Sequence, residues 1–227
     1  MKFDAVQVTG DNKSENKTAW EGKPDLSKFG EMDDFRIWKL FKQGDESAFV
    51  YIYKKYFKTL HNYGFQFTRN DNLIEDAIQD LFMDLRDRKE HLSDTDSIQP
   101  YLYQAYRRKI IRQRDREKKV FNELPATTFE LDFSIEDSII EKQTKEEITA
   151  KLKSEITKLS EQQREVLYLY FYKDFSYGEI GSILGYENTK SVRNLMYKTL
   201  DLLRESVPSL TLVTLMEILS TTVPKPV

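Results

Sequence analysis

The sequence contains no cysteine, and it has only 8 glycines, 6 prolines and 2 histidines among 227 residues. Without cysteine the chain can form neither a disulfide framework nor a thiolate metal site, and the lack of thiols fits a reducing compartment. The scarcity of glycine and proline argues against a turn-rich β protein, whereas 32% charged residues beside 39% hydrophobic ones favour long amphipathic helices. We therefore predict an all-α protein whose stability comes from packing.

The sequence motifs of common enzyme classes are also missing. No HExxH, CxxC, Walker-type glycine loop or GxSxG elbow occurs, and His61 and His91 lack the spacing of metal ligands. We expect no catalytic residue, no metal site and no cofactor. The first residues lack the apolar run of a secretory signal, and no segment approaches the ~20 apolar residues that cross a bilayer. The predicted location is the cytoplasm, without insertion into a membrane.

Composition and apolar spacing divide the chain into two small helical domains with three other segments around them. The first 33 residues mix charges with Gly, Pro, Asn, Ser and Thr, so we predict a flexible arm in which Trp20 and Phe29 are disordered. The segment between the two predicted domains, residues 120–141, is acidic, contains Pro125 and has no lysine or arginine, which favours a flexible linker. The predicted boundaries are 1–33 for the arm, 34–119 for the first domain, 120–141 for the linker, 142–206 for the second domain and 207–227 for an apolar tail.

The first domain is predicted to contain four helices. A short one starts at Asp34, a longer one follows the break at Gly44, and a third begins at a capping box formed by Asn72 and Glu75. The fourth runs from about Tyr101 to Lys119, after a polar loop and a proline that suits a first helical turn. The apolar stripes of these helices are expected to form the core of the domain.

The fourth predicted helix carries eight basic residues against two acidic ones, a local balance of +6 in a chain whose net charge is −3. Such self-repulsion is unfavourable unless an anion binds, which favours a nucleic acid over a merely solvated helix. Tyrosine rings beside these charges offer faces on which an unpaired base can stack, although at least one of them, and Leu102, should belong to the core. The DNA-binding residues predicted here are Tyr103, Tyr106, Arg107, Arg108, Lys109, Arg112, Arg114 and Arg116.

The second domain contains two capping-box signatures, at Ser160 with Gln163 and at Ser176 with Glu179, and each is expected to open a helix. The helix after Ser176 is short and is followed by a glycine and a longer helix. This order is typical of a helix-turn-helix, although an ordinary pair of antiparallel helices with a solvated face gives the same local pattern.

Two glycines and the polar face of the longer helix support the helix-turn-helix interpretation. Gly181 is a small residue where the helices cross, and Gly185 suits a left-handed turn position. The longer helix, from about residue 190, leaves a polar set outside its apolar stripe that can bind phosphates and base edges in a major groove. This predicted set is Lys190, Ser191, Arg193, Asn194, Tyr197 and Lys198.

Taken together, these segments resemble the extracytoplasmic-function group of bacterial sigma factors in the sigma-70 family, over roughly residues 45–205. In the first domain the resemblance rests on GDESAF at 44–49, EDAIQDLF at 75–82 and YLY at 101–103. In the second it rests on LSEQQREVL at 159–167 and FSYGEIGSILG at 175–185. The order and spacing of these segments are more specific than any one of them.

The resemblance implies a factor that binds RNA polymerase core and directs promoter recognition, DNA melting and transcription initiation, with no catalysis of its own. The first domain would bind the clamp helices of the largest polymerase subunit and the minus-ten element. The second would bind the flap region and the minus-thirty-five element. An anti-sigma factor is a further implied partner. The polymerase contacts are expected from Asp76, Gln79, Asp80, Met83 and Asp84.

Two other functions remain as alternatives. A conventional helix-turn-helix regulator with an N-terminal sensor or dimerisation domain would bind duplex DNA without polymerase, usually as a dimer on paired half-sites. A helical adaptor that binds only proteins would leave the basic helix unexplained.

Overall fold

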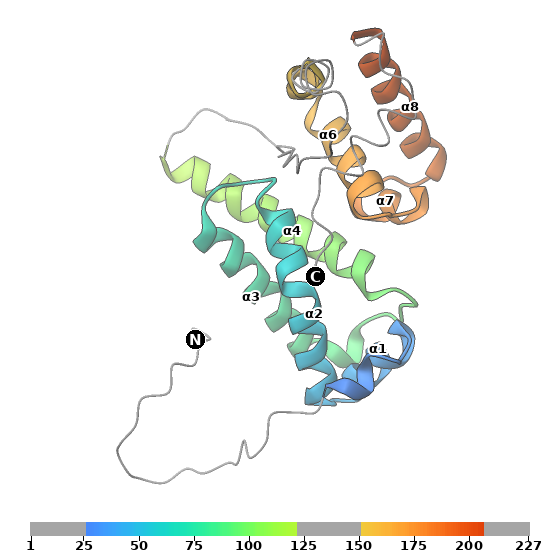
Figure 1. The fold of residues 1–227 in the computed structure, drawn as a ribbon. Helices are drawn as coiled ribbons and strands as arrows, with labels where there is room; N and C mark the ends of the chain where they lie inside the picture. The colour runs from blue at the N-terminus through green and yellow to red at the C-terminus, as the bar shows by residue number, and fades with distance from the viewer. Residues whose placement is uncertain (1–25, 122–150, 207–227) are drawn as a thin grey trace, which may run out of the picture.

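The computed structural model describes residues 26–121 and 151–206, and every regular element within these two ranges is helical. The prediction of an all-α fold is thereby confirmed for this part of the chain. The first domain consists of helices that follow one another along the chain, with 3₁₀ turns at Ser27–Phe29 and Lys89–His91 (Figure 1). Its α-helices are α1 (Asp34–Lys42), α2 (Glu46–Gly64), α3 (Asp71–Asp87) and α4 (Ile98–Phe121).

Side-chain caps define where these helices begin. Asp33 accepts a hydrogen bond from the backbone of Arg36, and Asp45 accepts from the first turn of α2. The predicted capping box of Asn72 and Glu75 is wrong by two residues, because Asn70 caps α3 and Asn72 already lies inside that helix. Each cap satisfies backbone N–H groups that a helix start leaves without a partner.

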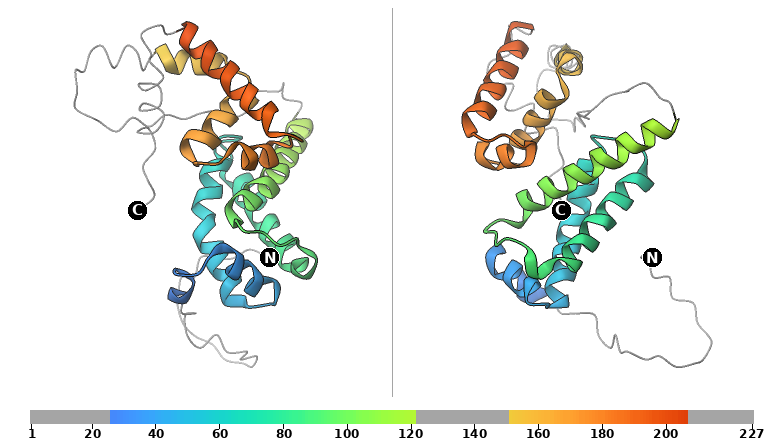
Figure 2. Two further views of the ribbon diagram at one scale, coloured as in Figure 1. Left: turned by 90° about the vertical axis from the view of Figure 1, so that its right-hand side faces the viewer. Right: turned by 180° about the vertical axis from the view of Figure 1, so that it is seen from behind.

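The first domain is held together by a core between α2, α3 and α4, with α1 packed across one end (Figure 2). Trp38 of α1 buries its ring and donates its indole N–H to the carbonyl of Ser93 at 2.9 Å. At the other end of the core, the hydroxyl of Tyr106 lies directly over Gly64, where a Cβ atom would be only 2.3 Å away. The absence of a side chain at Gly64 therefore lets α4 approach α2 closely.

The predicted flexible arm is corrected at its C-terminal end. Phe29 is completely buried, and its ring lies 5.1 Å from that of Tyr51 on α2. A large aromatic side chain gains about 1.5–3 kcal/mol from burial, which is enough to order a short turn. Residues 26–33 therefore belong to the first domain, whereas the remainder of the predicted arm, with Trp20, lies outside the described residues.

The described part of the second domain starts with helical residues 151–158 and continues through three further helical segments that end at residue 206. These segments are α6 (Glu161–Leu167), which runs into a π-helical turn at Tyr168–Tyr172, then α7 (Tyr177–Leu184) and α8 (Thr189–Ser206). Both predicted capping boxes, at Ser160 with Gln163 and at Ser176 with Glu179, are confirmed with reciprocal side-chain and backbone hydrogen bonds.

The turn between α7 and α8 has the predicted helix-turn-helix geometry. Gly185 adopts φ 80° and ψ 30°, a left-handed conformation that a residue with a Cβ atom adopts only with strain. A Cβ atom at Gly181 would lie 3.5 Å from a methyl group of Val192, so the two helices touch there. The N-terminus of α8 is capped by Asn188, whose side chain accepts from the backbone of Ser191 at 2.9 Å.

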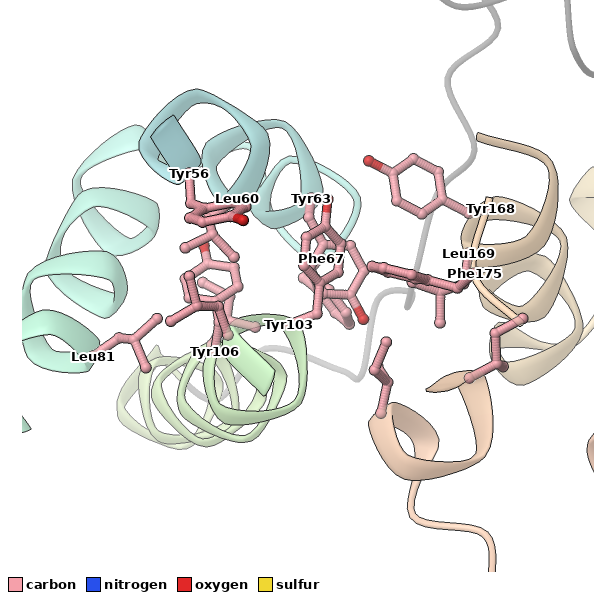
Figure 3. Packing of buried hydrophobic residues seen from close by; sticks show 14 of the residues in the cluster. Tyr56, Leu60, Tyr63, Phe67, Leu81, Tyr103, Tyr106, Tyr168, Leu169 and Phe175 are labelled. Carbon is pink, nitrogen blue, oxygen red and sulfur yellow. The ribbon is translucent and has the colours of Figure 1, made fainter. Parts of the chain in front are cut away.

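The two domains pack against each other through aromatic side chains (Figure 3). Tyr63 of α2 stacks on Tyr168 with ring centroids 5.7 Å apart, and Tyr103 of α4 meets Phe175 edge-on at 5.1 Å. Helix α7 packs against α4 in this arrangement (Figure 1). The predicted linker beyond residue 121 and the predicted C-terminal tail lie outside the described residues.

No helix in residues 26–121 or 151–206 combines the length and apolar character needed to span a bilayer. Within the same ranges, no group of three or more His, Cys, Asp and Glu side chains is arranged to hold a metal ion.

Candidate nucleic-acid interface

Helix α8 presents the predicted polar set on one accessible face. Its apolar stripe, which includes Val192 and Met196, is buried against the rest of the domain. Five of the six predicted residues are exposed, Tyr197 to 55%, and Ser191 is half-buried because it takes part in the cap of the helix. The geometry therefore places guanidinium, amide, phenol and ammonium groups side by side on a surface suited to a major groove. The exposed members are Lys190, Arg193, Asn194, Tyr197 and Lys198.

Arg193 is oriented by aromatic rings that the sequence alone did not place beside it. Its guanidinium lies 5.6 Å from the centre of the Tyr177 ring, and Tyr177 in turn stacks on Tyr170 at 5.1 Å. Burial, followed by the neighbouring phenol of Tyr170, raises the pKa of Tyr177 to about 12, so this ring is neutral at physiological pH. A cation over a neutral aromatic face is held in place without being neutralised.

Helix α4 carries an exposed stripe of three arginines. Arg108, Arg112 and Arg116 are spaced four residues apart, so they lie on one face at intervals of about 6 Å along the helix axis. They line one groove together with Arg107, Ile111 and one acidic residue, Asp115, which is itself paired with Arg114. No ion pair links any of these three guanidinium groups to an acidic side chain among the described residues. This stripe is therefore available to an anionic ligand.

The other predicted cations of α4 are bound to acidic side chains of the protein itself. Arg107 donates two hydrogen bonds of 2.8 Å to Glu165, and Arg114 donates one of 3.0 Å to Glu161. Lys109 pairs with Asp84 of α3. Burial acts to lower the pKa of Arg107, but the hydrogen bonds and charge of Glu165 outweigh it, so that pKa is raised. These three residues consequently contribute to packing in this arrangement.

The predicted DNA contacts of Tyr103 and Tyr106 are corrected by the structure. Both side chains are completely buried, because residues 102, 103, 106 and 110 together form the stripe with which α4 faces the core. Burial raises the pKa of Tyr103 well above its ordinary value, and it also raises the pKa of Tyr106. Leu102 is buried as predicted, whereas Tyr101, at the start of the helix, is half-buried and keeps some exposed surface.

The predicted polymerase-binding face lies on α3, opposite its apolar stripe. Asp76, Asp80 and Asp84 are exposed, but Asp84 pairs with Lys109 and Asp80 accepts a hydrogen bond of 2.7 Å from Gln113. Met83 is 49% exposed and, with the half-buried Gln79, borders an apolar groove of about 250 Å³. The other residues that line this groove are Phe49, Val50, Tyr53, Phe82 and Arg86.

Sequence analysis gave no role to Tyr63, Glu161 or Glu165, which bring the two domains together. Glu165 is completely buried between the domains and accepts hydrogen bonds from Arg107 and from the hydroxyl of Tyr63. Glu161 and Glu165 are four residues apart and share a face of α6, opposite Arg107 and Arg114, which are seven apart and share a face of α4. This complementary spacing was the available signal, but spacing alone does not reveal which helices meet.

Comparisons with known proteins give one family match, in the second domain, and similar folds among solved structures. Residues 156–205 match the family described as Sigma-70, region 4. The structure resembles CnrH in its complex with the cytosolic domain of CnrY, with a TM-score of 0.51, 16% identity, and coverage of 78% of this chain and 99% of that one. It also resembles the sigma factor RpoE in its complex with the anti-sigma factor NepR from Bartonella quintana, with a TM-score of 0.50, 17% identity, and coverage of 70% and 96%. No curated protein matches the sequence.

The fold and the face of α8 define a two-domain helical protein with a helix-turn-helix at its C-terminal end. Residues 156–205 match sigma-70 region 4, and the fold is similar to those of CnrH and of the sigma factor RpoE. The family resemblance drawn from the sequence is thereby confirmed.

Proposed function

We propose that this protein is a sigma factor that binds RNA polymerase core and directs promoter recognition, DNA melting and transcription initiation. One observation carries the proposal: the exposed polar face of α8 lies inside the region 4 match, and the same chain carries the arginine stripe of α4. Two separate cationic surfaces allow a chain of net charge −3 to hold a promoter at two places.

In the second domain, α8 reads the minus-thirty-five element in the major groove. Arginine pairs with guanine, and asparagine with adenine, through two hydrogen bonds each, and Arg193 and Asn194 are adjacent and exposed. Lys190 and Lys198 lie toward phosphates and fix the orientation of the helix rather than the base sequence.

In the first domain, α4 holds the minus-ten element. Arg108, Arg112 and Arg116 contact the backbone, and Tyr101 is the tyrosine at the start of this helix with accessible surface for an unpaired base. Because phosphate contacts release counterions, this binding weakens steeply with salt.

The acidic and apolar face of α3 binds the clamp helices of the polymerase. Asp76 and Asp80 are exposed acids, and the groove beside Met83 accepts an apolar side chain of the partner. The flap region of the polymerase is the proposed partner of the second domain. RpoE is bound to an anti-sigma factor in the solved complex, and we propose that an anti-sigma protein also restrains this chain. The protein acts in the cytoplasm and performs no catalysis of its own.

Run-off transcription with purified core polymerase tests this function. Core enzyme with the protein should initiate at discrete promoter positions, whereas core enzyme alone should not. A conventional helix-turn-helix regulator would bind duplex DNA but would not replace the initiation factor, and an adaptor would show no specific dependence on DNA. Absence of defined start sites with active core enzyme would reject the proposal.

A charge-reversal variant tests the role of α4 within the same assay. Changing Arg108, Arg112 and Arg116 to glutamate should weaken promoter complexes and lower the slope of log affinity against log salt by about 2, at roughly 0.7 per lost single-strand phosphate contact. The matched control changes three exposed lysines of the same domain, Lys39, Lys54 and Lys58, to glutamate. An unchanged slope in the arginine variant, or an equal change in the control, would reject this assignment.

A further inference from the structure

The contact between the domains joins the promoter-binding helix α4 to two carboxylates of α6. Glu165 has no exposed surface, accepts two hydrogen bonds of 2.8 Å from Arg107, and accepts another from the hydroxyl of Tyr63. Glu161 accepts a hydrogen bond of 3.0 Å from Arg114, whose side chain is only 11% exposed and also donates to Asp115 of its own helix. The two acids therefore neutralise one edge of the most cationic helix in the protein.

The chemistry of these pairs is that of phosphate recognition. The guanidinium fork of arginine matches the two oxygens of a carboxylate as well as it matches those of a phosphate. Arg107 also lines the same groove as Arg108, Arg112 and Arg116, so the carboxylate of Glu165 lies at the edge of the surface where a DNA backbone would lie.

From this arrangement we propose that Glu161 and Glu165 occupy, on α4, the positions of two DNA phosphates. In the closed arrangement described above, the second domain is thus an internal competitor for the minus-ten side of the first domain. The proposal rests on the proposed function, since it assumes that α4 binds DNA. It adds that DNA binding by α4 and closure of the two domains exclude each other.

The rest of the contact is consistent with a closure that can be released. Apart from the ion pairs, it consists of the packing of α7 against α4, aromatic contacts such as Tyr63 with Tyr168, and polar bonds such as that of the Gln104 amide to the carbonyl of Ser182. A buried ion pair contributes little net stability, because the loss of hydration offsets most of the attraction. DNA phosphates that replace the carboxylates of Glu161 and Glu165 would accept hydrogen bonds from the same arginines. Replacing the carboxylates by phosphates therefore leaves neither guanidinium without an anionic partner.

Opening would affect the two buried tyrosines differently. Phe175 of the second domain packs edge-on against Tyr103, so separation of the domains would uncover part of that ring. Tyr106 packs over Gly64 within the first domain, so it would stay covered. The exclusion therefore predicts that Tyr103, but not Tyr106, becomes accessible when DNA binds.

Distance measurements on the full chain test this exclusion directly. Because the sequence has no cysteine, spin labels can be attached at Lys54→Cys on α2 and Asp201→Cys on α8, both exposed positions. The free protein should give one short distance population. Adding a mixed-sequence single-stranded DNA at low salt should convert it to a longer and broader one. A DNA-bound protein that keeps the short distance would overturn the proposal.

Opposite variants of one ion pair give the second arm of the test. Glu161→Gln and Arg114→Gln should both shift the free protein toward the longer distance, but the first should strengthen DNA binding and the second should weaken it. Glu165→Gln should bind this DNA at least about tenfold more tightly, equivalent to about 1.4 kcal/mol. Glu205→Gln, at an exposed position on α8, is the matched control and should leave the distance unchanged.

The outcomes separate this proposal from the proposed function. Circular dichroism checks that each variant is folded, and the partly exposed Glu161 gives a test if the buried Glu165 variant is not. If Glu161→Gln binds DNA no more tightly than Glu205→Gln, internal competition is wrong even when run-off transcription succeeds. Loss of all promoter-specific initiation in the wild type would instead reject the proposed function.

Discussion

The hydroxyl of Tyr106 offers a test of whether this residue packs in the core or contacts DNA. It is buried and has no hydrogen-bond partner among the described residues, a situation that costs about 1–3 kcal/mol. Tyr106→Phe should therefore leave the free energy of unfolding unchanged or raise it by about 1 kcal/mol. Because the hydroxyl points at Gly64 and not at solvent, promoter-dependent transcription should also be unaffected.

The neighbouring glycine supplies the second half of a double-mutant cycle. In Gly64→Ala the new Cβ atom would lie 2.3 Å from the Tyr106 oxygen and 2.9 Å from Cγ2 of Ile74. Overpacking costs about 1–3 kcal/mol, whereas replacing a helical glycine by alanine gains about 1 kcal/mol. The single variant should thus lose about 0–2 kcal/mol by this difference. Adding Tyr106→Phe removes the closest contact and should restore part of the loss.

Denaturant unfolding monitored by circular dichroism measures all four proteins of the cycle, and run-off transcription is measured beside it. A loss of more than about 1 kcal/mol in Tyr106→Phe would show that the hydroxyl has a partner. Loss of initiation at unchanged stability would show that the ring reaches DNA, which would refute the core assignment.

Three further predictions address the second domain and the buried tyrosines. Arg193→Ala should weaken promoter binding by about 1–3 kcal/mol and relax base preference in the minus-thirty-five element. Arg204→Ala, at the far end of α8, is the control and should do neither. Equal effects of the two variants in a binding titration would contradict the role of Arg193. Gly185→Ala should destabilise the domain by about 1–2 kcal/mol because φ is positive at that position. Gly178→Ala is the control and should not, because a Cβ atom there has room. Thermal unfolding of the two variants compares their stabilities. Burial raises the pKa of Tyr63 and Tyr103 above 10.0, so the folded state holds these protons more tightly than the unfolded chain. Their contribution is complete below pH 10 and is lost as pH rises beyond it; a denaturation midpoint that stays constant above that pH would disprove this.

Local signals in the sequence were sufficient for most helix starts and for the turn. The boxes at Ser160 and Ser176 and the left-handed glycine at 185 were predicted correctly, because each depends on contacts within a few residues. The capping residue of α3 was misplaced by only two residues. Asn70 and Asn72 are both good capping residues, and which one caps the helix depends on where the core requires α3 to begin.

The candidate site was predicted less completely, because it depends on which helices meet. Helical spacing showed that Tyr103 and Tyr106 share a face, but not that this face is turned toward the core and the second domain. The sequence predicted that all the basic side chains of α4 on the DNA-binding side are available to DNA. Arg107 and Arg114 instead pair with acidic residues more than 45 positions away along the chain. Such long-range pairs leave no local pattern.

The closed arrangement also bears on the requirement that the two domains act at separate places on a promoter. They share a continuous buried cluster, in which α7 packs against α4, aromatic rings of the two domains meet, and Glu161 and Glu165 pair with arginines of α4. Relative motion of the domains of one chain is the general expectation unless their interface is large and hydrophobic. The two domains must therefore separate when the protein binds polymerase and DNA as proposed.

Transcription from a genomic DNA library by reconstituted core polymerase, with the start sites mapped, shows whether this protein selects promoters. The wild-type protein should create a defined set of start sites that share two upstream sequence elements, and Arg193→Ala should relax the element farther from the start. Start sites that are the same with and without the protein would contradict this prediction.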